Sequence, residues 1–302
     1  MERSRILVIV VTYNAMAWVD RCMGSLLNTT IPCDVLVVDN GSTDGTQNYI
    51  KKHYPNYLFK QCENNVGFGR ANNLGLQKVL DDGYEFAYLL NQDAWVMPDT
   101  FEKLIEVSER NPCYGVLSPI QIQANNRHLD KYFAKNVIGY SQHTEPLLID
   151  DLFFGRQNEV YEVTYVMAAH WMISRKCLEM VGGFSPTFPH YGEDDNYMGR
   201  VIFHNMKVGI VPYLSVVHDR ADRKESKEKC IYMGYIRSLI YLSRLDRSFF
   251  KAFFYMFNIN LELSFKYKSW TPVFNMFKIM FHLRTIFRNK RSTMINGRTF
   301  LC

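Results

Sequence analysis

Three apolar runs in this chain end abruptly in polar side chains. Residues 35–38 are Val-Leu-Val-Val, and the run stops at Asp39, where a polar, turn-rich segment leads into a helical pattern. Runs at 9–11 and 88–90 end similarly, in Thr-Tyr-Asn and Asn-Gln-Asp. Ligands of open α/β sheets bind where strands end and loops begin. We therefore expect these three strand ends to meet at one site.

Strand and helix patterns alternate through the first half of the chain. Apolar strands are expected near 5–12, 34–39, 57–62, 84–90 and 114–120, with helices near 16–27, 44–53, 69–82 and 98–110. Continuous apolar strands between helices predict a mostly parallel sheet covered on both faces. Farther along we expect a loop or hairpin over 121–162, a strand over 163–174 broken at 168–170, a helix over 194–205, and short strands at 207–211 and 214–217.

The charge of the chain is unevenly divided. Residues 1–222 carry 19 Lys/Arg and 26 Asp/Glu, whereas residues 223–302 carry 16 Lys/Arg and 4 Asp/Glu. We therefore expect an α/β domain over 1–222 and a helical, basic, aromatic-rich region over 223–302. Phenylalanines of this second region recur at helical spacing, at 250, 253, 254 and 257 and at 274, 277 and 281.

The basic region has two interpretations. A basic amphipathic segment is typical of an anchor that lies on an anionic membrane surface. The same pattern also fits a helical layer packed on the α/β domain, or on a second subunit of a homo-oligomer. No nucleic-acid partner is expected, because no recognition motif accompanies the charge. No run of about 18 apolar residues occurs, so we expect no membrane-spanning helix.

The seven cysteines are scattered and never occur as Cys-x-x-Cys. This spacing argues against a disulfide framework or a zinc site and is typical of proteins in a reducing cytoplasm. The apolar run at 6–11 is short for a signal peptide and reads as a buried first strand. We expect a cytoplasmic protein, peripheral on the inner face of the cell membrane if the basic region binds lipid.

Asp39 and the segment 64–73 are candidates for contacts with a nucleotide. A carboxylate at a strand end can accept hydrogen bonds from a base imide or a ribose hydroxyl, although Asp is also common in turns. Gly67 and Gly69 allow the backbone to approach a ligand, and Arg70 adds a charge-assisted contact. A simple loop-to-helix junction explains this segment equally well, and its glycines lack the spacing of the dinucleotide fingerprint.

A divalent cation is the second candidate ligand. Asp93 ends the strand-like run through Asn91 and Gln92, and a carboxylate there suits Mg²⁺ or Mn²⁺. His218 ends another expected strand and could supply a second ligand, although a lone histidine is usually structural.

Three adjacent acids, Glu193, Asp194 and Asp195, precede an expected helix. The helix dipole favours acids in a first turn, which is one explanation for them. Three carboxylates exceed what capping requires, so we interpret the cluster as the source of a general base.

Taken in order, these segments resemble family 2 glycosyltransferases of the GT-A fold, and most closely the bacterial rhamnosyltransferase-like enzymes of surface polysaccharide synthesis. The matching stretches are residues 11–14, 37–46, 65–76, 89–96, 182–184 and 193–195, with His218. They cover about residues 5–220, and the ordered set is specific although no single stretch is. The resemblance implies a Rossmann-like, mostly parallel central sheet flanked by helices, followed by the basic helical segment.

The resemblance also implies an inverting, metal-assisted transfer of a sugar from a UDP- or dTDP-linked donor to a hydroxyl of a glycan or lipid-linked acceptor. The implied nucleotide-sugar contacts are Thr12, Tyr13, Asn14, Asp39, Asn65, Gly67, Arg70, Asn91 and Gln92. Asp93 and His218 would hold Mg²⁺ or Mn²⁺. Asp194 would be the base, with Asp195 as the fallback and Glu193 beside them, and His170 and Trp171 would shape the acceptor pocket.

The sequence departs from the family's pattern at two places. Asn91 stands where the Asp-x-Asp motif has its first acid, which removes one charge from the cation site. Asp219 and Arg220 follow His218 in place of the usual glycine and serine. Two other functions stay open. A nucleotidyltransferase would need a Gly-rich, basic first loop, which residues 10–17 lack, and a non-catalytic sugar-binding protein would not need Asp93, Asp194 and His218 together.

Overall fold

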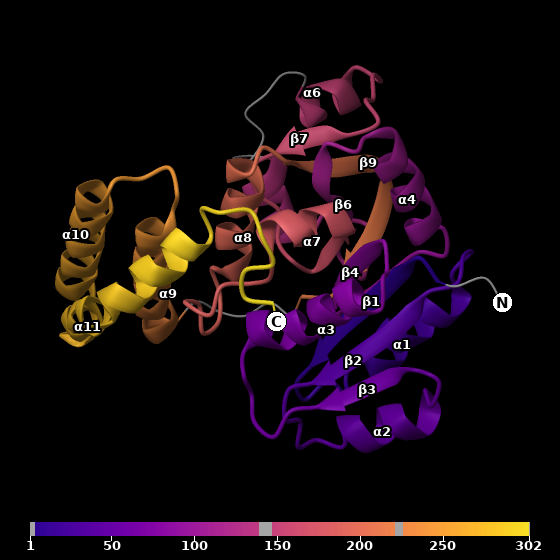
Figure 1. The fold of residues 1–302 in the computed structure, drawn as a ribbon, viewed down its shortest axis with the longest axis horizontal. Helices are drawn as coiled ribbons and strands as arrows, with labels where there is room; N and C mark the ends of the chain where they lie inside the picture. Colours follow the sequence, from indigo (N-terminus) through magenta and orange to yellow (C-terminus); the bar gives the residue numbers. More distant parts are fainter. Residues whose placement is uncertain (1–3, 139–146, 221–225, 302) are drawn as a thin grey trace.

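A computed structural model describes residues 4–138, 147–220 and 226–301 (Figure 1). Its strands are β1 Ile6–Thr12, β2 Asp34–Asp39, β3 Leu58–Gln61, β4 Phe86–Asn91, β5 Ala94–Trp95, β6 Tyr114–Ile122, β7 Tyr161–Val163, β8 His170–Ser174 and β9 Lys207–His218. The α-helices of the first part are α1 Val19–Ser25, α2 Thr46–His53, α3 Phe68–Asp81, α4 Thr100–Arg110, α5 Lys131–Phe133, α6 Leu148–Phe153, α7 Arg175–Val181 and α8 Glu193–Phe203. Helices α9 Lys227–Ser243, α10 Phe249–Tyr267 and α11 Thr271–Ser292 follow, and tighter or wider helical turns occupy Leu26–Asn28 and Ala134–Ile138.

One sheet contains all nine described strands, in the order β3-β2-β1-β4-β8-β6-β9-β5, with β7 paired to β9. Strands β1 to β4 are parallel to one another, β8 is antiparallel to both β4 and β6, and β6 is parallel to β9. In register, Thr12 lies opposite Asp39 and Val11 lies opposite Asn91. The carboxyl ends of β1, β2 and β4 therefore lie level at one edge of the sheet, as the sequence predicts.

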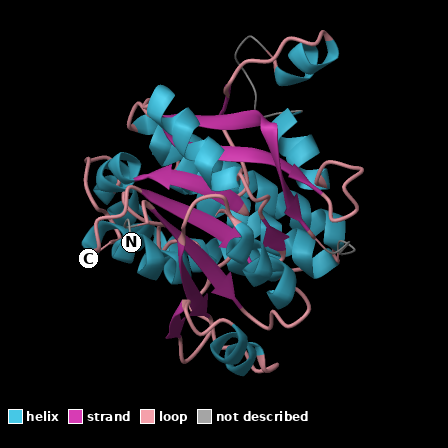
Figure 2. Cartoon of the chain, turned by 90° about the vertical axis from the view of Figure 1, so that its right-hand side faces the viewer, coloured by secondary structure: helices cyan, strands magenta, loops and turns pink. Residues whose placement is uncertain are grey.

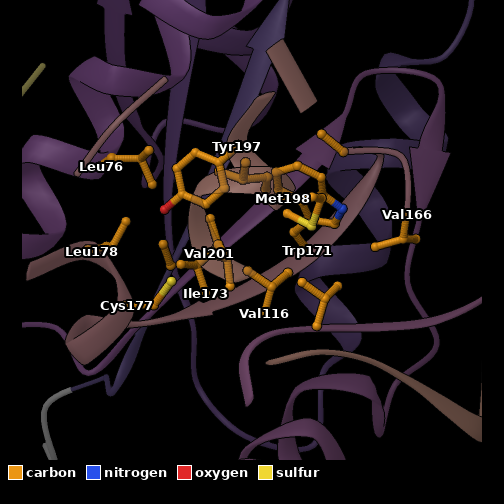
Figure 3. Close-up of a cluster of buried hydrophobic side chains, with 14 of the residues drawn as sticks. Leu76, Val116, Val166, Trp171, Ile173, Cys177, Leu178, Tyr197, Met198 and Val201 are labelled. Carbon is orange, nitrogen blue, oxygen red and sulfur yellow. The ribbon is translucent and has the colours of Figure 1, made fainter. Parts of the chain in front are cut away.

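Helices cover both faces of the sheet (Figure 2). Alternate residues of a strand point to opposite sides, so the apolar central strands present a surface to be buried on each face. Leu7 and Ile9 of β1 pack toward α3, α7 and α8, whereas Ile6, Val8 and Val10 pack toward α1, α2 and α4. Both faces of β1 are fully buried, which explains its unbroken apolar run. Figure 3 shows the first of these cores, where Trp171 of β8 and Tyr197 of α8 lie with their ring centroids 5.8 Å apart.

The predicted strands and helices of the first half are confirmed, but the short strand β5 was not expected. The other differences come later in the chain. The strand expected over 163–174 is two strands with different partners, since β7 pairs with β9 and β8 lies between β4 and β6. The two short strands expected at 207–217 are one continuous β9. Its pairing with β6 shifts between Pro119–Val211 and Ile120–Ser215, and this irregularity is the break that the sequence pattern detects.

The loop or hairpin predicted over 121–162 is partly helical. It contains α5, a wider helical turn and α6 before β7 begins. Residues 139–146 of this stretch lie outside the described residues. Helix α5 begins after Asp130, whose carboxylate accepts hydrogen bonds from the backbone N–H groups of Tyr132 and Phe133.

Helices α9, α10 and α11 form a layer at one end of the molecule, with α9 next to α8 (Figure 1). Ile236, Leu239, Met256 and Ile279 build a third core there, and Phe188 joins it from the preceding part of the chain. The expected helical layer packed on the α/β domain is therefore present, while the division at residue 222 stays a prediction. Within the described residues, none of the helices is both long and apolar enough to cross a bilayer.

The end of the chain returns to the α/β domain. Gly183 donates its N–H to the Thr299 carbonyl at 2.8 Å, and Gly297 donates to the Met180 carbonyl at 2.9 Å. Gly182 has φ of +79°, and a Cβ there would overlap the Thr299 backbone. Only glycine therefore fits between α7 and this terminal segment.

Gly182→Ala is expected to lower the free energy of unfolding by about 3 kcal/mol, because it adds both backbone strain and a clash with Thr299. Gly155→Ala is the matched control: its φ is +66°, but nothing lies within 4 Å of its added Cβ. This control should lose only about 1 kcal/mol. Urea unfolding measures both losses, and equal losses would show that the terminal segment does not depend on Gly182.

Candidate active site

Asp39 is buried at the end of β2 and organises the edge of the sheet around it. Its carboxylate accepts hydrogen bonds from the Thr12 hydroxyl at 2.9 Å and the Ser42 hydroxyl at 2.6 Å. The backbone N–H groups of Gly41 and Ser42 and the Gln47 amide supply three further donors. These five donors exceed the about four lone-pair sites of a carboxylate, so Asp39 is fully engaged in holding β1 and the loop after β2 in place. Its contact with a nucleobase stays a prediction.

The ends of β1 and β4 are joined across the same edge. Gln92 accepts a hydrogen bond from the Tyr13 N–H at 2.6 Å and donates one to the Tyr13 carbonyl at 3.2 Å. Asn14 has φ of +52° and accepts from the Thr43 N–H at 2.9 Å. The Tyr13 side chain is 47% exposed, so the edge presents an aromatic ring to solvent.

The loop before α3 lies close to the acids of α8. Asn65 accepts hydrogen bonds from the Asn40 amide at 2.9 Å and the Gly67 N–H at 3.0 Å, which fixes the loop against the end of β2. A Cβ on Gly67 would lie 2.5 Å from the Pro189 carbonyl, and one on Gly69 would lie 3.7 Å from Glu193. The predicted segment 64–73 and the predicted acids 193–195 therefore lie next to each other. Arg70, which belongs to the first segment, is exposed.

Asp93 and His218 are far apart in sequence but adjacent in the fold. Strand β5 pairs with β9 so that Ala94 lies opposite His218, and the Asp219 N–H donates to the Asp93 carbonyl at 2.7 Å. Nε2 of His218 lies 3.5 Å from Oδ1 of Asp93. The structure therefore brings together the two residues predicted to hold a cation.

Asp130, which the sequence reasoning missed, lies behind His218. Its Oδ2 is 3.8 Å from Nδ1 of His218, and its other oxygen caps α5. Both side chains are almost fully buried. At this separation the two groups are not hydrogen-bonded, and Nδ1 of His218 has no hydrogen-bond partner within the described residues. A carboxylate that does accept this hydrogen bond orients imidazoles toward metals in proteins, and Asp130 is the carboxylate placed behind Nδ1.

The Asp93–His218 pair has the donor chemistry of a divalent-cation site. The pKa of the Asp93 carboxyl lies below its ordinary value: burial opposes ionisation most strongly, but the His218 hydrogen bond and charge, with Arg220, outweigh it. The buried Oδ1 of Asn91, two positions before Asp93 in the chain, has no hydrogen-bond partner within the described residues. Among the described residues no three His, Cys, Asp or Glu side chains form a complete cage. A cation here would depend on ligand phosphates and waters, as Mg²⁺ usually does.

The three acids of α8 share a partly buried first turn. Asp194 accepts hydrogen bonds from the Tyr165 hydroxyl at 2.8 Å and from the Asp195 N–H at 2.9 Å. Burial raises the pKa of Asp194 above its ordinary value and outweighs these hydrogen bonds. Burial and then the charge of Asp194 raise the pKa of Glu193 to about 8 and that of Asp195 to about 6. Acids with raised pKa values in a shared site are candidates for proton transfer.

Arg220 is the cation whose charge acts on both sets of acids. Its positive charge lowers the pKa values of both Asp93 and Asp194, although burial remains the largest influence on each. Its Nε lies 3.6 Å from Oδ2 of Asp130, and its guanidinium lies 4.7 Å from the centroid of the Tyr132 ring. Sequence reasoning noted Arg220 only as a departure from a family pattern and did not identify Tyr165 at all.

His170 and Trp171 are both fully buried, although they were expected near an acceptor pocket. His170 lies 2.9 Å from both the Tyr88 hydroxyl and the Val217 carbonyl, and burial lowers its pKa to about 3. Trp171 packs in the core with Phe184 and Tyr197 (Figure 3). These side chains can support the chain around an acceptor but do not reach one from where they lie.

The comparisons of this chain with known proteins agree on one family. A family model described as "Glycosyl transferase family 2" matches residues 7–182. The N-acetylglucosaminyl-diphospho-decaprenol L-rhamnosyltransferase of Mycobacterium tuberculosis is 33% identical over 122 residues, which are 37% of this chain and 40% of that protein. The chondroitin synthase of Escherichia coli is 28% identical over 127 residues, 41% of this chain and 17% of that protein. The matches therefore span well under half the length of these relatives.

Solved structures share the fold over nearly the whole chain. S. aureus TarS 1–349 in complex with UDP-GlcNAc superposes with a TM-score of 0.55 at 15% identity, covering 96% of this chain and 90% of that one. The mannosyltransferase PcManGT from Pyrobaculum calidifontis, in complex with GDP-Man and Mn²⁺, gives 0.58 at 15% identity and covers 97% and 81%. At such low identity the likeness concerns the fold alone, and it confirms the predicted GT-A architecture.

Proposed function

Because the chain belongs to glycosyl transferase family 2, we propose that it transfers a sugar, with inversion, from a UDP- or dTDP-linked donor to a hydroxyl of a glycan or lipid-linked acceptor in surface polysaccharide synthesis. Glycosyl transfer is the general part of this proposal, and the donor, acceptor, stereochemistry and metal dependence are its finer parts. The single observation that carries the proposal is the Asp93–His218 pair, in which Oδ1 of Asp93 lies 3.5 Å from Nε2 of His218.

The donor would lie along the level ends of β2, β1 and β4. Thr12, Tyr13, Asn14 and Asp39 would contact the base and ribose, with the exposed Tyr13 ring available for stacking. A nucleobase that binds Asp39 must replace one of the five groups that now donate to its carboxylate. The Gln47 side chain is the donor best able to move aside. The sugar–diphosphate part would then lie among Asn65, Gly67, Arg70, Asn91 and Gln92.

Asp93 and His218 would hold Mg²⁺ or Mn²⁺, and Asp130 would keep His218 oriented. When bound, such a cation neutralises the charge that develops on the departing diphosphate. Asn91 contributes an uncharged oxygen where relatives carry an acid, so the chain relies on the single carboxylate of Asp93.

Asp194 would remove the proton from the acceptor hydroxyl. The acceptor oxygen forms a bond to the anomeric carbon as the bond from that carbon to the diphosphate breaks. The proton passes to Asp194, and the nucleoside diphosphate leaves. One displacement inverts the anomeric centre. The raised pKa of Asp194 suits a group that must accept a proton near neutral pH.

We place this reaction in the cytoplasm. The six cysteines within the described residues are all free, and two of them, Cys22 and Cys177, are buried with their thiol pKa values raised by burial. Buried thiols of this kind suit a reducing compartment.

Tyr165→Phe should move the acidic limb of the kcat/KM profile to higher pH by about one unit. The Tyr165 hydroxyl stabilises the ionised form of Asp194, so its loss raises the pKa of the base further. Because the base acts only when ionised, activity then begins to fall at a higher pH. Tyr161→Phe, which removes a hydroxyl bonded to Asp151 instead, is the control and should leave the limb in place. A uniform loss of activity with an unmoved limb would mean that Tyr165 does not act through Asp194.

A panel of nucleotide sugars with and without Mn²⁺ tests the proposed donor. A ligand that binds the native state raises the unfolding temperature, so selective stabilisation by one UDP- or dTDP-sugar is expected, and more strongly with Mn²⁺. The stabilising donor should then release its nucleoside diphosphate when incubated with the chain. Formation of a nucleoside triphosphate and a sugar 1-phosphate when pyrophosphate is added to the donor would indicate a nucleotidyltransferase. Stabilisation without any turnover would indicate a binding protein.

A further inference from the structure

Helices α10 and α11 each carry a row of exposed aromatic side chains. We call these eight residues the aromatic face: Phe250, Phe254, Phe257 and Phe265 on α10, with Trp270, Phe274, Phe277 and Phe281 at the start and along the first half of α11. Their exposure runs from 45% for Phe257 to 87% for Phe281. Spacings of three, four and eight residues keep each row on one side of its helix.

The aromatic face is not needed to hold these helices together. The buried residues of these helices include Ala252 and Met256 of α10 and Met276 and Ile279 of α11, which lie on the other sides of the two helices. Helix α10 and the start of α11 lie at the end of the molecule farthest from the N-terminus (Figure 1). So large a group of exposed rings on a well-packed layer marks an interaction surface.

The charge around the aromatic face is almost entirely positive. Residues 249–292 contain eight Lys/Arg and a single acid, Glu262. In the second half of α11, Arg284, Arg288 and Arg291 line a hollow of about 700 Å³ together with Thr285 and Phe287. The same helix thus carries exposed rings first and a basic hollow after them.

We propose that α10 and α11 dock on the surface of an anionic bilayer. The rings of the aromatic face enter the headgroup region, and Arg284, Arg288 and Arg291 contact lipid phosphates. Amphipathic helices with aromatic and basic residues bind membranes in this way without crossing them. A second copy of the chain is the weaker partner for this face, because it would bring the eight cations of one subunit toward those of the other.

Docking through α10 and α11 would place the candidate active site near the bilayer. Helix α9 connects the two, since a Cβ on Gly192, just before Glu193, would lie 2.9 Å from Ile236 and 3.1 Å from Ile240. The Tyr232 hydroxyl also donates to the His190 carbonyl at 3.0 Å. The proposal goes beyond the proposed function, and it can be tested without measuring any sugar transfer.

Co-sedimentation of the full chain with vesicles tests the proposal. The chain should sediment with vesicles of phosphatidylcholine and phosphatidylglycerol, bind phosphatidylcholine alone much less, and detach as salt is raised. Phe254→Ser with Phe281→Ser should weaken binding by about tenfold or more, because two exposed rings lose their place in the lipid. Arg284→Glu with Arg288→Glu should weaken it at least as much on anionic vesicles.

Matched controls distinguish binding through the aromatic face from nonspecific binding to vesicles. Phe153→Ser removes a ring that is 83% exposed on α6, and Lys52→Glu with Lys60→Glu makes the same charge change near β3. Both controls should bind vesicles like the unaltered chain. Failure to bind anionic vesicles, or equal binding by all variants, would overturn the proposal. The proposal would also be overturned if the chain formed a dimer by sedimentation equilibrium, did not bind vesicles, and lost the dimer in the Phe254→Ser, Phe281→Ser variant.

Discussion

Asp194→Asn should lower kcat for sugar transfer by about 10³-fold while leaving the affinity for the nucleoside diphosphate unchanged. Asn has nearly the shape of Asp and can still accept the Tyr165 hydrogen bond, but it cannot take a proton from the acceptor. Asp194 is also not among the residues expected to contact the nucleotide. Initial rates of transfer, measured beside calorimetric titration with UDP or dTDP, separate the two effects.

The same substitution should not destabilise the fold. Burial raises the pKa of Asp194, so the folded chain holds the proton more tightly than the unfolded chain does. At neutral pH the ionised side chain therefore lowers the stability of the folded state, and Asn removes that charge. We expect Asp194→Asn to unfold at the same denaturant concentration or a higher one. Asp195→Asn is the matched control and should lose far less activity; a larger loss there would move the base to Asp195.

Asp93→Asn should lower kcat by about 10²- to 10³-fold and remove the effect of Mn²⁺ on donor binding. Asp93 supplies the carboxylate at Nε2 of His218, and its depressed pKa indicates that this position favours the ionised form. Asparagine keeps the size of the side chain but removes the charge that would hold the cation. Donor affinity measured across a series of Mn²⁺ concentrations gives the expected loss of metal dependence.

Asp219→Asn is the matched control for Asp93. Asp219 follows His218 directly, but its carboxylate lies 3.5 Å from Arg21 rather than at the cation pair. The control should keep both its activity and its response to Mn²⁺. If Asp93→Asn kept the Mn²⁺ response and Asp219→Asn lost it, the cation site would have to be reassigned to the other side of His218.

The first half of the fold could be predicted from the sequence because its signals are local. The strands β1, β2 and β4 are unbroken apolar runs, and each ends at a polar residue that stays at the sheet edge. The separation of β7 from β8 depends on which distant strands they join, so no local pattern could show it. The shift in the β6–β9 pairing likewise appears in the sequence only as an interruption of the apolar pattern.

Local sequence signals and tertiary packing also contribute differently to the candidate site. Asp39, Asp93 and Asp194 stand at recognisable positions where a strand ends or a helix begins. Asp130 and Tyr165 lie in irregular segments, and only tertiary packing brings them to His218 and Asp194. His170 and Trp171 illustrate the opposite case, because polar or large side chains in sequence can be interior residues of a central strand.

The sequence of residues 223–302 fits both a packed helical layer and a membrane-surface anchor. In the structure, some of its residues serve the first role and others suit the second. Ile236, Leu239 and Met256 form an ordinary packed core, as a helical layer requires. Phe254, Phe265 and Phe281 stay exposed, as a docking surface requires. Helical spacing alone could not separate these roles, because buried and exposed rows recur with the same period along α10 and α11.

A crystal structure of the chain with UDP and Mn²⁺ is the decisive experiment for the candidate active site. We expect the uracil to lie beside Thr12 and Tyr13, and the diphosphate and the cation to lie at Asp93 and His218, facing Asp194. A nucleotide bound away from the carboxyl ends of β1, β2 and β4, or a cation held without Asp93, would contradict it.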